Sequence, residues 1–197
     1  MALSFAIPSF AMGFKLLRVW RDPVSLDEGR WVRYGVGLFV MEFIVLHAGI
    51  MIGGAAAADG SIGLTLLLLG FYGLFAALIA LGFRNTSLFS SFLFVIGGRA
   101  LGSLLGISTD SQALFLAHSL IGMVLYFVLV FSSVLLPWPR LGITEAIAAE
   151  QRVPGSSGLW VDKPHRAIGP AAAYFLLLGI AEVALLTWVD AATLVPG

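Results

Sequence analysis

Five ionisable side chains lie within long apolar stretches of the sequence, where they could perform acid–base or ligand chemistry. They are Glu42, His47, Arg99, His118 and Glu182. Ionisable residues within a membrane are expensive, and they usually pair with one another or line a polar path. Counting about 1.5 Å per residue along the predicted helices places all of these except Glu42 in one layer of the outer half of the membrane. We therefore treat this intramembrane polar cluster as the candidate site.

Arg99 and Glu182 are predicted to form a buried ion pair. Arg99 lies on a helix with small residues at a spacing of four, namely Gly98, Gly102 and Gly106. Such a ladder allows close approach of two membrane helices. The favoured interpretation is a pair that fixes helix packing, and the alternative is an anion or proton site.

The two histidines suggest a second chemistry. His47 and His118 lie at similar predicted depth on different helices, and two such imidazoles can ligate a haem iron axially. A haem b carrier is therefore one alternative, although a single membrane histidine more often hydrogen-bonds to a neighbouring helix. A metal site of His47, His118 and Glu182 has suitable ligand types but lacks a recognised spacing. Glu42 shares a helix face with Gly35, Gly49 and Gly53, which predicts a packing face around a structural acid.

The composition predicts an all-α integral membrane protein. Hydrophobic residues make up 59% of the 197, charged residues make up 11%, and the mean hydropathy is +1.00. Soluble domains carry about 25% charged residues. Five apolar stretches are long enough to span a bilayer. The predicted transmembrane helices are 34–58, 62–83, 86–107, 112–136 and 167–189, within a single domain covering 1–197.

The remaining segments set the predicted topology. Residues 2–20 contain an apolar run that is too short to span, so we expect an interfacial helix there, with a short extra span as the alternative. Residues 140–166 form a loop with a short helix at 144–151 that Thr144 could cap. With five spans, every Lys and Arg except Arg99 falls on one side. The positive-inside rule then puts the N-terminus and the 140–166 loop in the cytoplasm and the C-terminus outside, in a multi-pass protein of the cell inner membrane.

The sequence favours a non-enzymatic role. It contains no phosphate-binding glycine loop and no nucleophile elbow, and we expect a helical subunit or assembly helper containing the Arg99–Glu182 pair. A small transporter or channel and a haem b electron carrier remain alternatives. The expected partners are the lipid bilayer and a second membrane protein or another copy of the chain. The zero net charge gives no basic surface for nucleic acid. Lys163, His165 and Arg166 next to Trp160 form an anchor that would meet an anionic leaflet.

Overall fold

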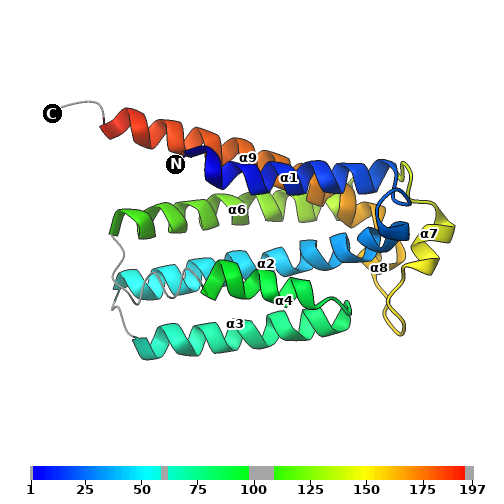
Figure 1. The fold of residues 1–197 in the computed structure, drawn as a ribbon, viewed down its shortest axis with the longest axis horizontal. Coiled ribbons are helices and arrows are strands. Elements are labelled where there is room, and N and C mark those ends of the chain that lie inside the picture. Colours follow the sequence, from blue (N-terminus) through cyan, green and yellow to red (C-terminus); the bar gives the residue numbers. More distant parts are fainter. Residues whose placement is uncertain (1, 59–61, 98–108, 194–197) are drawn as a thin grey trace. The chain divides into compact units, whose positions relative to one another are not determined.

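The computed structural model describes residues 2–58, 62–97 and 109–193. These residues form helices and connecting turns, with no strand among them, which confirms the predicted all-α class (Figure 1). The helices are α1 (Ala2–Arg21), α2 (Arg30–Ala58), α3 (Ile62–Gly82), α4 (Thr86–Phe92), α6 (Thr109–Leu135), α7 (Glu145–Glu150), α8 (Leu159–Asp162) and α9 (His165–Thr193). A 3-10 turn, η1 (Asp27–Gly29), precedes α2, and a π-helical turn, η2 (Leu93–Gly97), follows α4.

Within the described residues, four helices are long and apolar enough to cross a membrane. The segments are Asp27–Ala55, Ile62–Gly82, Leu116–Leu135 and His165–Ala184. They correspond to four of the five predicted spans. The remaining predicted span, 86–107, begins as α4 and η2, and its residues 98–107 lie outside the described part of the chain.

The chain forms two compact units. Unit 1 comprises Met1–Gly35, Leu125–Arg152 and Ser156–Gly197, and unit 2 comprises Val36–Val124 and Val153–Gly155. Helices α2 and α6 contribute residues to both units. Each unit is described separately below.

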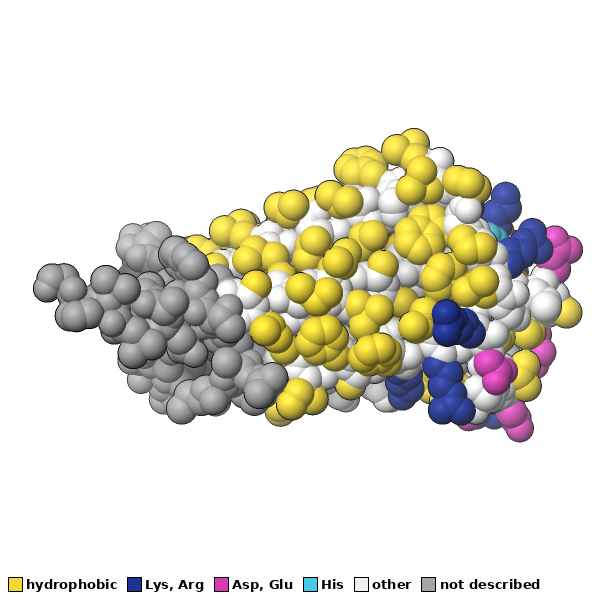
Figure 2. Space-filling model, turned by 90° about the horizontal axis from the view of Figure 1, so that it is seen from above, with side chains coloured by type: hydrophobic (Ala, Val, Ile, Leu, Met, Phe, Trp, Pro, Cys, Tyr) yellow, Lys and Arg dark blue, Asp and Glu magenta, His cyan; other side chains and the backbone are white. Residues whose placement is uncertain are grey.

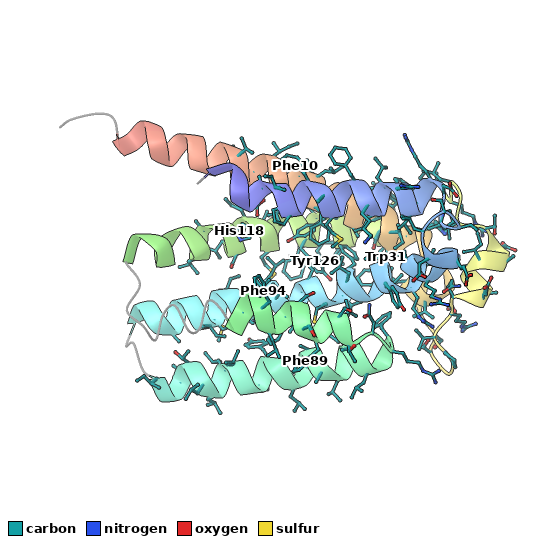
Figure 3. The ribbon with its side chains drawn as sticks, in the orientation of Figure 1. Phe10, Trp31, Phe89, Phe94, His118 and Tyr126 are labelled. Atoms are coloured by element: carbon teal, nitrogen blue, oxygen red, sulfur yellow. The ribbon has the colours of Figure 1, made fainter. Side chains whose placement is uncertain are left out.

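Unit 1 is built on α1 packed antiparallel along α9. A Cβ added at Gly13 would lie 2.8 Å from the Leu176 side chain, and one added at Gly179 would lie 3.1 Å from the Phe10 ring (Figure 3). Nearer the end of α1, a Cβ at Gly169 would lie 2.9 Å from Trp20. The residue numbers of the contacting positions therefore rise along α1 as they fall along α9, which shows that the two helices run antiparallel. Helix α1 therefore follows α9 lengthwise.

The buried face of α1 is apolar and so is its opposite face. Leu16 and Val19 have no exposed surface, whereas Ile7 is 60% and Phe14 is 61% exposed. A helix that is apolar all round belongs in a protein core or in lipid. The charged residues Lys15, Arg18 and Arg21 lie in the last two turns.

Unit 2 has its own apolar core between α2, α3 and the α4–η2 segment. It comprises Met41, Ala48, Ile52, Tyr72, Ala76, Ala80, Leu88, Phe92 and Ile96. Large apolar side chains also face outward, including Leu67 at 69%, Leu81 at 71% and Phe94 at 85% exposed (Figure 3). An outer surface of this kind suits contact with lipid rather than water.

Side-chain caps begin two of the helices. Asn85 Oδ1 accepts a hydrogen bond from the Ser87 backbone N–H at 3.0 Å at the start of α4. Thr144 Oγ1 accepts one from the Ile147 N–H at 3.3 Å, which is the cap predicted for the short helix in the loop. These bonds satisfy donors that the first turn of a helix leaves without partners.

Candidate functional site

The structure distributes the intramembrane polar cluster over both units. Glu42, His47 and His118 belong to unit 2, and Glu182 belongs to unit 1, where it is 7% exposed. Arg99, like Gly98, Gly102 and Gly106, lies outside the described residues. The Arg99–Glu182 pair and the common layer therefore stay predictions.

His47 has aromatic neighbours. Its ring centroid lies 5.4 Å from that of Phe43 one turn earlier on α2 and 5.6 Å from that of Tyr72 on α3. His118 lies on α6 (Figure 3). Among the described residues, no three His, Asp or Glu side chains gather closely enough to hold a metal ion. The haem hypothesis stays untested, and the contacts that the structure gives His47 are those of a packed side chain.

The predicted packing glycines coincide only in part with those that make the tight contacts: Gly35 lies on the predicted face, and a Cβ added there would collide with the Ile168 side chain. Gly49 is buried, and a Cβ added at Gly53 would lie 4.0 Å from Leu116, an ordinary van der Waals distance. Much closer approaches occur at Gly13, Gly142 and Gly169 of unit 1. Sequence spacing within one helix did not reveal these, because each contact depends on a distant segment.

A folded cap closes one end of unit 1. We use the term cap for residues 136–152 and 156–166, the unit 1 part of the connection between α6 and α9, which contains α7 and α8. The Gly142 N–H donates to the Trp20 carbonyl at 3.0 Å, and Trp20 Nε1 donates to the Pro139 carbonyl at 2.9 Å. The cap is thereby fastened to the end of α1.

The cap also binds the last turns of α6. Trp138 Nε1 donates to the Ser132 carbonyl at 3.1 Å, and an Arg166 N–H donates to the Val134 carbonyl at 3.2 Å. Trp160 Nε1 donates to Ser133 Oγ at 3.0 Å. The final carbonyls of a helix lack helical partners, and Arg166 satisfies that of Val134, whereas the Ser132 carbonyl also accepts the Leu136 backbone N–H.

An open groove of about 400 Å³ lies within the cap. Its lining combines charged side chains with a small apolar wall, and comprises Arg140, Ile143, Thr144, Glu145, Ala148, Ala149, Arg152, Val161, Asp162, Lys163 and His165. Figure 2 shows that the Lys and Arg side chains on the visible face gather at the end where Figure 1 has α7 and α8. The groove is therefore part of the charged end of unit 1.

Two ion pairs hold the groove walls. Arg140 lies 2.7 Å from the Glu145 carboxylate, and Arg152 lies 2.9 Å from that of Asp162. Arg152 also donates to the Ser156 carbonyl at 3.0 Å. Lys163 is exposed and forms no ion pair with any described residue. The lining thus carries three cationic side chains against two carboxylates.

His165 forms the buried side of this groove. It is 7% exposed, and the positively charged side chains of Arg140, Lys163 and Arg166 lie near it. The sequence analysis identified Lys163, His165 and Arg166 as a membrane anchor and missed the groove, which requires Arg140 and α7 to fold against α8. Four basic residues within 140–166 were the available signal.

Comparison with protein families, curated proteins and solved structures found no match to this chain.

Proposed function

We propose that the protein is a multi-pass membrane protein that crosses the bilayer six times and serves as a non-catalytic helical component of a membrane assembly. In this arrangement the cap lies in the cytoplasm, and the first residues of α1 lie outside. The antiparallel packing of α1 along α9 carries the proposal. It replaces the interfacial helix with the short extra span that the sequence left as the alternative.

The length and surface of α1 support a membrane crossing. Its 20 residues extend about 30 Å, close to the thickness of the hydrocarbon core, with Lys15, Arg18 and Arg21 confined to the last two turns. The outward side chains Ile7 and Phe14 are apolar. If α9 crosses the bilayer, a helix packed lengthwise against it lies in the same apolar layer.

The basic residues support the orientation. Arg18 and Arg21 end α1, Arg30 begins α2, and the cap carries Arg140 and Arg152, all within unit 1. Lys15 lies deeper, and its ammonium lies 3.5 Å from the centroid of the Trp31 ring near the start of α2 (Figure 3). That contact directs the charge toward the cap end, as expected of a lysine that extends to the interface. The positive-inside rule assigns this end to the cytoplasm.

The non-catalytic role rests on how the polar side chains of the spans are packed. His47 contacts two aromatic rings, and Glu182 is almost fully buried. Both placements suit side chains that specify packing. A transporter and a haem carrier stay the alternative hypotheses.

Cysteine labelling tests the six-span topology, and the chain contains no natural cysteine. Single variants Ser4→Cys on α1, Val24→Cys before α2 and Ser157→Cys in the cap are treated in intact cells with a membrane-impermeant maleimide. We expect labelling of Ser4→Cys only, and labelling of the other two after permeabilisation. Protection of Ser4→Cys in intact cells, with labelling after permeabilisation, would place both ends of α1 in the cytoplasm and refute the sixth span.

A further inference from the structure

We propose that the cap groove binds the phosphate of an anionic lipid headgroup, with Arg140, Arg152 and Lys163 as the binding residues. The inference deepens the proposed function, because it depends on the cap lying at the cytoplasmic membrane surface. This cluster combines a cavity, a lysine with no ion pair among the described residues and a position at the ends of apolar helices.

The groove carries more positive than negative charge. Glu145 forms an ion pair with Arg140, and Asp162 forms one with Arg152. Each guanidinium has five N–H donors, more than one ion pair uses. Arg140 and Arg152 remain 48% and 47% exposed as side chains, so donors stay accessible beside the ion pairs. Lys163 adds a charge without a described counter-ion. Guanidinium forks and an ammonium are the groups that proteins use to bind phosphate.

The groove lies level with the ends of two long apolar helices, α6 and α9. Trp138 and Trp160 are hydrogen-bonded to the last turns of α6, and the groove lies beside the first turn of α9. Tryptophans at helix ends mark the level of the lipid headgroups. A phosphate in the groove would therefore lie at the height of the phosphate layer of the inner leaflet.

One wall of the groove is apolar. Ala148, Ala149 and Val161 supply an apolar surface next to the cationic side chains, and Ile143 lies buried behind it. A hydrated inorganic ion gains nothing from such a surface, whereas the glycerol and ester region of a lipid would cover it. The volume, about 400 Å³, falls within the range of small-molecule sites.

Titration of the full-length protein in neutral detergent tests the site. The probes are dioctanoyl phosphatidic acid, dioctanoyl phosphatidylcholine and inorganic phosphate, at constant ionic strength, with bound ligand counted by native mass spectrometry. We expect phosphatidic acid to bind at least tenfold more tightly than the other two. Equal binding of phosphatidylcholine would overturn the role of charge, and equal binding of inorganic phosphate would overturn the lipid as its source.

Variants with opposite expected signs separate binding from folding. Lys163→Gln removes an exposed charge and should weaken phosphatidic acid about tenfold, equivalent to one charge-assisted contact. Glu145→Gln releases Arg140 from its 2.7 Å pair and should strengthen binding roughly two- to fivefold. A damaged fold could not tighten binding.

Arg84→Gln is the matched control, because it removes one exposed basic charge outside the groove. It should leave the affinity unchanged. Equal weakening by Arg84→Gln and Lys163→Gln would show a general charge effect and refute the groove. Because binding is measured in detergent, this result is independent of the labelling experiment that tests topology.

Discussion

At the scale of single residues, Gly142 has the strictest steric requirement in the cap. A Cβ there would collide with the Arg21 carbonyl oxygen and lie 2.8 Å from Pro23 Cδ. The Gly142 N–H also donates a hydrogen bond to the Trp20 carbonyl, so the backbone cannot move away without losing that hydrogen bond. This glycine allows the cap to contact the end of α1.

Gly142→Ala should therefore destabilise the protein by about 1–3 kcal/mol, the usual cost of overpacking. Gly70→Ala is the control, since a Cβ there meets nothing within 4 Å and alanine favours a helix. Thermal unfolding in detergent compares the two. A Gly142→Ala protein as stable as Gly70→Ala would show that the cap does not lie against α1.

His47 offers a second test at this scale. Because it packs against Phe43 and Tyr72, His47→Phe should preserve the melting temperature, whereas His47→Asp should lower it by several degrees. The same samples, prepared from cells supplied with haem, are examined by absorption spectroscopy before and after reduction. A Soret band that is present in the parent protein and absent from His47→Phe would replace the packing role with haem ligation.

At the scale of elements, hydropathy located the helices but not their partners. The α2, α3, α6 and α9 segments were predictable because each holds about 20 apolar residues in succession, and the Thr144 cap because its signal is local. The placement of α1 was not predictable in this way. Its apolar run ends at Lys15, and neither the length of that run nor its composition shows that Gly13 and Gly179 fit against α9.

A disulfide test addresses the pairing of α1 with α9. Gly13→Cys with Leu176→Cys should cross-link under mild oxidation, because a Cβ at position 13 lies 3.0 Å from the Leu176 backbone nitrogen and the second change removes the crowding side chain. Gly13→Cys with Leu177→Cys is the control, since Leu177 is 43% exposed. Cross-linking of the control pair alone, or of neither pair, would contradict the antiparallel packing.

At the scale of the whole molecule, the orientation of the cap can be predicted from the sequence, whereas the groove in the cap is apparent only in the folded structure. The one-sided distribution of Lys and Arg can be read from the sequence and predicts the orientation of the cap. The groove cannot, because Arg140 and Lys163 are separated by more than twenty residues and meet only when α7 and α8 fold. The same holds for the number of spans, which depends on whether α1 packs lengthwise against another helix.

The most direct test of the central claim is the parity of membrane crossings. Different epitope tags are attached to the two ends of the chain, and intact cells whose outer surface is accessible are treated with protease. Six spans predict that both tags are digested while a tag inserted at Ser157 in the cap survives. Survival of the N-terminal tag with loss of the C-terminal tag would mean five spans and would contradict the account.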